Sequence, residues 1–333
     1  MNHVHSALRA VALTASVVCA AAPVFARQTP KPDEPRERRY RVAVARADGV
    51  IVPFAEHDEG YWRPIWSGFE TWGSHDLPLT LDDVTPRWWG QDGPALTWWL
   101  WQRHGVAEAL TVTAPRVVAT PCQTEVGLVT GYKSPVPVPP ATAAPYPKAG
   151  LATTAPIDVE PIVPLEKDSP IWKRVRTAAS RELPRAEQHA LYQMQWAHPT
   201  PERERNAAPF DLQNVWHVPG GRFYYFEAMR RYPEKKTPRG EEPCDLVTYV
   251  AGYLWENGKG ELVSAGSSAL VTYCHLESAV FMWPLGAIRE GSRVYWVLQM
   301  AGWNGESYSV VEMLTSRGEV RTRHTHLAGA CRL

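Results

Sequence analysis

The sequence lacks an excess of charge of either sign, since its 35 lysines and arginines balance 35 aspartates and glutamates. Binding to nucleic acid or to an acidic membrane surface over a broad area requires a basic excess that displaces counterions. The chain also lacks the low hydrophobicity of disordered proteins, because 44% of its residues are hydrophobic and 21% are charged. We therefore expect a folded protein without a nucleic-acid partner.

The motifs that hold nucleotides and many metal ions are also missing. The sequence contains no Walker loop, no Rossmann glycine fingerprint, no H-E-x-x-H pattern and no calcium-binding loop. The serine-centred G-x-S-x-G elbow found in many hydrolases is absent as well. On these grounds we predict no cofactor, and nucleotide-dependent chemistry is disfavoured.

Long apolar runs are confined to the N-terminus. Arg9 precedes an apolar run at residues 10–22, and Val24-Phe25-Ala26 places small residues at the recognition positions that follow. This order is typical of a secretory signal peptide, and the run is shorter than the ~20 residues that cross a bilayer. We predict a signal peptide at residues 1–26 and a flexible, charged and proline-rich leader at residues 27–39. The mature chain is then expected to have no membrane span and to reside in the periplasm or the extracellular medium.

Cysteines are few, and only four remain after removal of the signal peptide: Cys122, Cys244, Cys274 and Cys331. In an oxidising compartment four cysteines suggest two disulfides. Cys244 and Cys274 flank two strands expected to be neighbours, so we predict a Cys244–Cys274 disulfide and, by elimination, a Cys122–Cys331 disulfide. Free buried thiols are the alternative. A cysteine metal site is disfavoured because no C-x-x-C pair occurs.

Tryptophan and proline, in contrast, are abundant, with 15 and 30 residues. Eight tryptophans lie between residues 62 and 101, where they would form either a buried aromatic core or stacking platforms for sugars. Prolines crowd residues 134–167, which we expect to run as an extended linker or surface strap rather than as a helix or a central strand.

These composition changes predict the domain organisation. We expect a Trp-rich β region at residues 40–133, a Pro-rich strap at 134–167, a two-helix segment at 168–205 and a C-terminal antiparallel β region at 206–333. Strands are expected at residues 41–45, 50–54, 61–66, 97–102, 109–118, 126–132, 222–231, 246–255, 262–273, 280–288, 293–301, 307–315 and 319–327. Helices are expected after Ser169-Pro170 and again at residues 185–197, after Pro184. The predicted fold class is mainly β, with antiparallel meander, barrel-like or sandwich-like regions, a short two-helix insertion and a Pro-rich strap.

The Asn304-Gly305 dipeptide predicts a two-residue hairpin turn, because this pair accepts the positive φ angles that such a turn needs. The resulting register pairs Gln299 with Val310 and Tyr295 with Leu314. One face of the hairpin is then apolar, with Trp296, Leu298, Met300, Val311 and Met313.

The opposite face of this hairpin mixes aromatic, amide and carboxylate side chains. Together with an aromatic strand nearby, it supplies the candidate binding residues Tyr225, Tyr295, Gln299 and Tyr308. Such a face suits a binding groove, and it equally suits a second packing surface.

Two further sets of residues carry possible chemistry. Glu227 and Glu312 lie on aromatic strands and could act as acid and base in glycoside hydrolysis if their carboxyl groups lie close together. His324 and His326 share one strand face and could bind a metal ion, although a third ligand must come from elsewhere.

We weigh three functions. The leading hypothesis is a non-catalytic secreted or envelope binding module that recognises a glycan or an envelope protein through an aromatic β-surface. The alternatives are a secreted glycosidase-like hydrolase that uses Glu227 and Glu312, and a structural envelope component.

Overall fold

Three antiparallel β-sheets make up most of the protein, which confirms the mainly β fold class. The computed structural model describes residues 39–69, 78–89, 97–102, 107–135, 137–140, 143, 145–233, 245–273, 279–302 and 305–331. The predicted signal peptide, all but the last residue of the predicted leader, and the Cys244–Cys274 pair lie outside these residues. Glu37–Leu333 form one compact unit.

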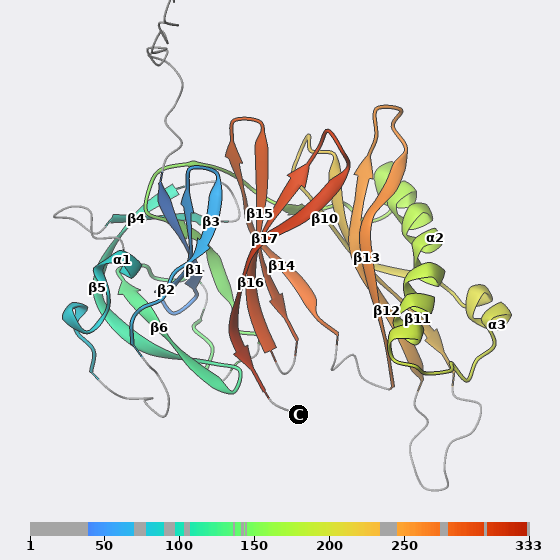
Figure 1. The fold of residues 1–333 in the computed structure, drawn as a ribbon, viewed down its shortest axis with the longest axis horizontal. Helices are drawn as coiled ribbons and strands as arrows, with labels where there is room; N and C mark the ends of the chain where they lie inside the picture. The colour runs from blue at the N-terminus through green and yellow to red at the C-terminus, as the bar shows by residue number, and fades with distance from the viewer. Residues whose placement is uncertain are drawn as a thin grey trace, which may run out of the picture. The chain divides into compact units, whose positions relative to one another are not determined.

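The first sheet closes into a six-stranded barrel (Figure 1). Around the ring its strands are β1 (Tyr40–Arg46), β7 (Lys148–Thr153), β4 (Thr97–Gln102), β5 (Ala107–Thr120), β6 (Gln123–Thr130) and β2 (Val50–Asp58). Pairing of β2 with β1 closes the ring, and β3 (Tyr61–Pro64) adds to the other side of β2.

Tryptophans fill the barrel, as the buried-core interpretation of the Trp-rich region predicted. Trp98 is fully buried among Leu100, Leu128 and other apolar side chains that point inward. Trp88 and Trp89 reach this core from the short helix α1 (Pro86–Trp89), which follows the 3₁₀ turn η1 (Leu81–Asp83). Large aromatic side chains bury much apolar area each, so this interior anchors the barrel.

The second sheet, here called the central sheet, has both faces covered. Its strands in order are β17 (Glu319–Ala330), β16 (Gly305–Leu314), β15 (Arg293–Ala301), β14 (Phe281–Glu290) and β8 (Asp158–Glu160). Val297 and Val310 pack against the barrel, whereas Trp296, Leu298 and Val311 pack against the third sheet. Alternating side chains therefore enter two different cores, which explains why the strand sequences are apolar on both faces.

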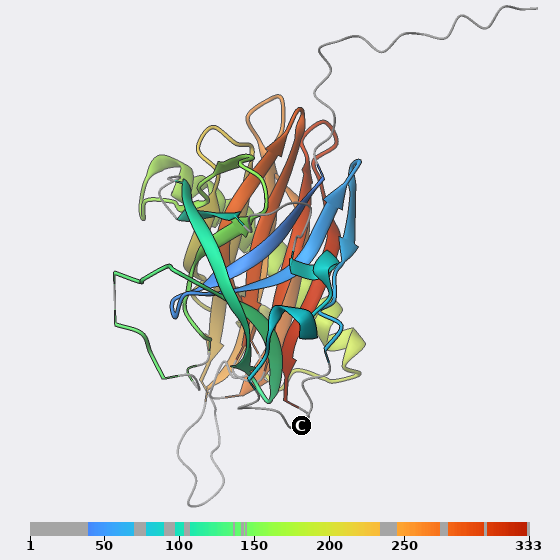
Figure 2. The same cartoon turned by 90° about the vertical axis from the view of Figure 1, so that its left-hand side faces the viewer.

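The third sheet, here called the outer sheet, lies between the central sheet and a helix. Its strands in order are β13 (Leu262–Tyr273), β12 (Leu246–Glu256), β11 (Phe223–Tyr232), β10 (Asp211–His217) and β9 (Val163–Pro164). Figure 2, viewed from the barrel side, shows the blue and green barrel strands in front of the red strands of the central sheet.

The helix α2 (Pro170–Gln193) covers the outer face of the outer sheet. Ser169 caps it by accepting a hydrogen bond from the Trp172 amide at 3.2 Å. The prediction of two helices here is wrong, because α2 continues through Pro184. Leu183 and Ala186, on either side of this proline, are both buried in the same core, and that packing offsets the lost amide donor. The next helix along the chain is α3 (Glu202–Ala207), which neither of the two predicted helices covers.

The Pro-rich segment contributes a strand to each of the three sheets. Residues 148–153 contain no proline and form β7 between β1 and β4, although we expected no central strand from this segment. Further along, β8 and β9 join the edges of the central and outer sheets. The segment therefore links all three sheets and is more than a strap over their surface.

The predicted Cys122–Cys331 disulfide is confirmed, with the two Cα atoms 5.0 Å apart. Cys122 lies in the turn between β5 and β6 of the barrel, and Cys331 directly follows β17. The bond therefore fastens the edge of the central sheet to the barrel.

The predicted register of the β15–β16 hairpin is wrong by two residues. Gln299 pairs with Tyr308 and Tyr295 with Glu312, because the hairpin closes one residue earlier, where the Gly302 amide donates to the Gly305 carbonyl at 2.9 Å. A shift of two residues keeps every side chain on its predicted face. The assignment of Trp296, Leu298, Val311 and Met313 to one core face is therefore confirmed.

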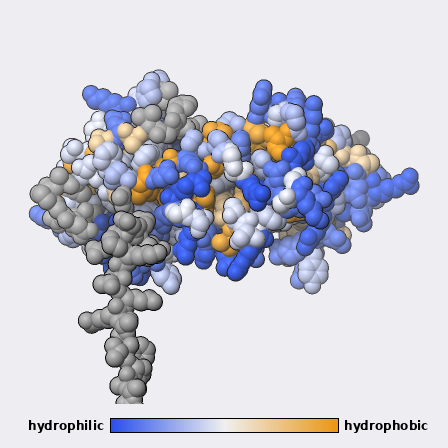
Figure 3. Space-filling model, turned by 90° about the horizontal axis from the view of Figure 1, so that it is seen from above, coloured by the Kyte–Doolittle hydropathy of each residue, from blue (hydrophilic) through white to orange (hydrophobic). Residues whose placement is uncertain are grey.

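In the described part of the chain, no helix has the length and apolar character needed to cross a membrane. Figure 3 shows one face of the molecule, on which hydrophilic residues predominate and apolar residues form several small groups. That face offers no single extended apolar surface.

Candidate functional site

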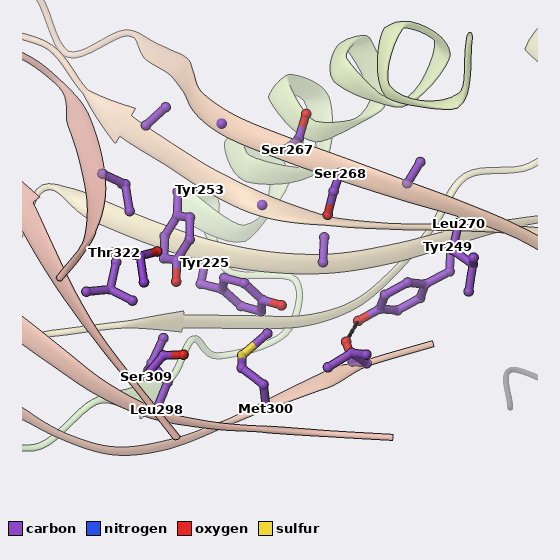
Figure 4. A pocket seen from close by; sticks show the side chains of 18 residues that line it. Tyr225, Tyr249, Tyr253, Ser267, Ser268, Leu270, Leu298, Met300, Ser309 and Thr322 are labelled. Carbon is purple, nitrogen blue, oxygen red and sulfur yellow. Dashed lines mark hydrogen bonds between the residues drawn. The ribbon is translucent and has the colours of Figure 1, made fainter. Parts of the chain in front are cut away.

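A cleft of about 480 Å³ lies between the outer and central sheets (Figure 4). Apart from Val280, which precedes β14, its residues come from β11, β12 and β13 on one side and from β15, β16 and β17 on the other. β13 and β17 are edge strands of their sheets, whereas β11 and β15 are inner strands. Its volume lies within the range of small-molecule binding sites.

Three tyrosines stand in a row along the wall formed by the outer sheet: Tyr253, Tyr225 and Tyr249 (Figure 4). The rings of Tyr225 and Tyr253 pack edge to face, with centroids 5.1 Å apart. The Tyr249 hydroxyl donates to the Val280 carbonyl at 3.2 Å. Burial raises the pKa of each of the three phenols, so all three remain protonated at neutral pH and can donate hydrogen bonds.

The facing wall is largely apolar, with Leu298, Met300 and Val311 from the central sheet. Hydroxyl groups lie nearer the edge strands. Ser268 of β13 points toward the tyrosines, whereas Ser267 points to the other side of the sheet, as strand alternation requires (Figure 4).

Exposure distinguishes the mouth of the cleft from its base. Ser268 and Thr322, on the two edge strands, are exposed, whereas Tyr225 and Leu298, on the inner strands, are buried. A ligand would therefore enter between β13 and β17 and reach Tyr225 and Leu298 last.

The cleft carries no charge of its own. Among the described residues that line it there is no aspartate, glutamate, lysine, arginine or histidine. Hydroxyl groups and apolar side chains therefore dominate the recognition chemistry, and a charged ligand would lose its hydration without gaining a counter-charge.

Glu227 lies behind the tyrosines and joins the two sheets. Its Oε1 accepts the Met282 amide of the central sheet at 2.8 Å, and its Oε2 accepts the Asn214 side-chain amide at 2.8 Å. Burial raises the pKa of this carboxyl group and outweighs the opposing effect of the hydrogen bonds. Both carboxylate oxygens accept hydrogen bonds, so Glu227 anchors the outer sheet to the central sheet.

The structure does not bring Glu227 and Glu312 to one site. Glu227 points from the outer sheet toward the central sheet, whereas Glu312 lies on the barrel side of the central sheet, opposite Tyr295. Arg323 Nε donates to Glu312 Oε2 at 2.6 Å, and Arg293 Nε lies 4.0 Å from its Oε1. Glu312 is thus a buried ion-paired residue, as the packing-surface interpretation expected.

The four predicted binding residues are also divided between two places. Tyr225 lines the cleft, whereas Tyr295 and Tyr308 are buried against the barrel. The Tyr295 ring packs on Trp62 at 5.3 Å, and the Tyr308 hydroxyl donates to Glu306. Gln299 pairs with Tyr308 and is buried on the same barrel side.

His324 and His326 face the barrel, and both rings lie near Phe54. His324 Nε2 is 3.1 Å from the Phe54 carbonyl, and His326 Nε2 is 2.6 Å from Glu125 Oε1. Within the described ranges, no group of three or more histidine, cysteine or acidic side chains is placed to hold a metal ion.

The sequence interpretation missed Tyr249, Tyr253, Ser268 and Thr322. A signal for the first two was present, because Tyr249, Ala251 and Tyr253 alternate along one predicted strand and so share a face. The sequence did not reveal which other sheet would pack against this face.

A scan against protein-family models and searches of curated proteins and solved structures found no match to this chain.

Proposed function

We propose that this protein is an exported, non-catalytic binding module that holds a neutral glycan in the cleft between its outer and central sheets. The observation that carries the proposal is the lining of this cleft, which combines a row of tyrosines with serine and threonine hydroxyls and has no charged side chain among its described residues. Export is inferred from the predicted signal peptide at residues 1–26.

A sugar ring matches such a lining chemically. Its C–H faces are apolar and pack on aromatic and aliphatic side chains, while its hydroxyl groups exchange hydrogen bonds with side-chain hydroxyls that both donate and accept. A neutral sugar also leaves no buried charge uncompensated. The leading sequence hypothesis named a glycan or an envelope protein as the partner, and the size of the cleft favours the smaller ligand.

The cleft residues support binding rather than catalysis. Glu227 is the carboxyl residue nearest in sequence to the tyrosines of the cleft. Its two carboxylate oxygens accept hydrogen bonds from the Met282 amide and from the Asn214 side-chain amide. A general acid or base must be free to reach the atom on which it acts.

The test is calorimetric titration of the mature protein with a panel of neutral and acidic oligosaccharides. We expect at least one neutral oligosaccharide to bind, and Tyr253→Ala to weaken it at least tenfold. Tyr192→Ala is the matched control, because Tyr192 is 82% exposed on α2, which covers the other face of the outer sheet. Absence of binding across the panel, or binding that Tyr253→Ala leaves unchanged, would overturn the proposal.

A further inference from the structure

The cleft is elongated along the strands of the outer sheet. Every residue from Ala265 to Leu270 of β13 lines it, and so do Tyr249 and Tyr253 of β12. These two tyrosines are four residues apart and therefore point to the same side of β12, and Figure 4 shows them at the two ends of the tyrosine row. Four residues of a β-strand span about 13 Å. The cleft is thus longer than a single sugar ring.

Small side chains keep the middle of the cleft open. Ala251 lies between Tyr249 and Tyr253 on the same face of β12. It pairs across the sheet with Ser268 of β13, whose side chain points toward the tyrosines (Figure 4). An alanine and a serine therefore stand halfway along the row, where larger side chains would divide the cleft into two pockets.

Both ends of the cleft reach the solvent. At one end, Thr322 of the central sheet is exposed and lies beside the Tyr253 ring (Figure 4). At the other end, Tyr249 lies beside Leu270 (Figure 4), and Val280, whose carbonyl accepts from the Tyr249 hydroxyl, is 45% exposed. A site that recognises the end of a chain is closed beyond the last unit, whereas exposed residues stand here at both ends.

A linear sugar chain laid along the tyrosine row matches these dimensions. A pyranose ring that is linked through opposite carbons advances a chain by roughly 5 Å, since each of its bonds is ~1.5 Å long. A row of about 13 Å therefore takes about three such units. The aromatic rings follow one another along the row, so successive sugar rings each meet an aromatic side chain.

We propose that this protein binds a linear neutral polysaccharide through an internal segment of about three sugar units, which lies along the row from Tyr253 to Tyr249 and leaves the cleft at both ends. This inference rests on the proposed glycan-binding function and names the ligand as a polymer rather than a free mono- or disaccharide. Leu270 and Thr322 then contact the outermost units of the bound segment.

The test measures affinity against chain length by calorimetric titration with the mature protein. The probes are β-1,4-linked oligosaccharides of glucose, mannose and N-acetylglucosamine, each with one to six units. In a series that binds, the dissociation constant should fall at least tenfold from one unit to three, because each added ring gains contacts until the cleft is filled. From four units to six it should change less than twofold.

A second probe tests whether the two ends of the bound chain are free. The six-unit oligosaccharide of the binding series is modified with a bulky group at each end, and its affinity is compared with that of the unmodified sugar. We expect the two dissociation constants to agree within twofold. Loss of binding caused by a group at either end would show that the cleft recognises a chain end, and would overturn the inference.

Two substitutions test the placement of the chain along the row. Thr322→Ala and Leu270→Ala alter its opposite ends, and each should weaken the four-unit oligosaccharide at least threefold. The two-unit oligosaccharide should change less than twofold, because it can lie away from the altered end. A variant that fails to fold would instead lose both sugars, so the comparison separates a contact at the end of the cleft from a structural role.

The matched controls are Thr315→Ala and Leu327→Ala. Thr315 is exposed and Leu327 is 59% exposed, and neither is among the described residues that line the cleft. Both variants should bind sugars of every length as the wild type does.

The outcomes distinguish this inference from the function on which it rests. If the three series and a wider panel of neutral sugars all fail to bind, glycan binding itself is wrong. Equal affinity for one unit and for six would leave glycan binding in place and overturn the polymer inference. End variants that weaken short and long sugars by the same factor would overturn the placement of the chain along the tyrosine row.

Discussion

The ammonium group of Lys148 lies 2.6 Å from Glu306 Oε1, and the two side chains are almost fully buried between the barrel and the central sheet. Lys148 belongs to β7 and Glu306 to β16, so this ion pair joins two sheets. Lys148 also donates to the Tyr146 carbonyl at 2.7 Å. Burial lowers the pKa of Lys148, and the neighbouring Glu306 carboxylate acts in the opposite direction.

Removal of one partner of this ion pair should destabilise the folded protein. Lys148→Met leaves Glu306 buried without its cation, and we expect the free energy of unfolding to fall by about 3–5 kcal/mol. Lys148→Met combined with Glu306→Leu should lose clearly less than the sum of the two single changes. Urea denaturation of all four proteins measures this coupling.

The surface pair Arg321–Glu319 provides the control, because both side chains are about half exposed and their N–O distance is 2.8 Å. Arg321→Met should change stability by less than about 1 kcal/mol. Additive effects at Lys148 and Glu306 would show that the buried pair does not stabilise the contact between the sheets.

The Cys122–Cys331 disulfide closes a loop with a sequence separation of 209 residues. Replacement of both cysteines by alanine should lower the free energy of unfolding by roughly 2–5 kcal/mol. Mass spectrometry of the non-reduced, digested protein should find this linkage, and it also tests the Cys244–Cys274 linkage predicted from the sequence. A variant as stable as the wild type would contradict the stabilising role.

The raised pKa of the Glu227 carboxyl group predicts how the free energy of unfolding depends on pH. Burial raises its folded-state pKa above the ordinary value of 4.5, so the folded protein binds this proton more tightly than the unfolded chain. The stabilisation that comes from this tighter proton binding is fully present below pH 4.5 and is lost as the pH rises toward the folded-state pKa.

Glu227→Gln removes this titration. The stability of the variant relative to the wild type should therefore rise between pH 4.5 and 7, by on the order of 1 kcal/mol. Denaturation curves across this range give the difference. A flat difference across this range would contradict the raised pKa.

The predicted signal peptide has a direct test. When the full chain is expressed in a bacterium with a periplasm, the exported protein should begin at Arg27, after cleavage behind Ala26. N-terminal sequencing identifies the first residue. Retention of residues 10–22 in the recovered protein would show that this segment is not a cleaved signal.

Local sequence patterns predicted many of the strands. The bounds of β13 and β15 are those expected from their β-branched and aromatic residues, and the two faces of β15 were assigned correctly. Alternation is a local property, so a single strand reveals it.

Contacts between elements that are far apart in the sequence were not predictable from local patterns. The strand β10, Asp211–His217, was missed because its alternation is weak, and the continuity of α2 through Pro184 depends on packing against a sheet formed later in the chain. The cleft brings together Tyr225, Ser268 and Thr322 from three strands, and no local pattern shows which sheet faces meet. The predicted Glu227–Glu312 site illustrates this limit. Both strands were predicted, but not that the two carboxyl groups lie on opposite sides of the central sheet.

The segment that supplies β7, β8 and β9 has a consequence for folding kinetics. Each of the three sheets needs a strand from residues 148–164 to be complete. In the barrel and in the central sheet, these strands pair with strands that are far away in the sequence. Such non-local pairing slows folding, and a proteolytic cut within this segment would weaken all three sheets together. We expect the molecule to unfold as one cooperative unit, so its sheets are not separable modules.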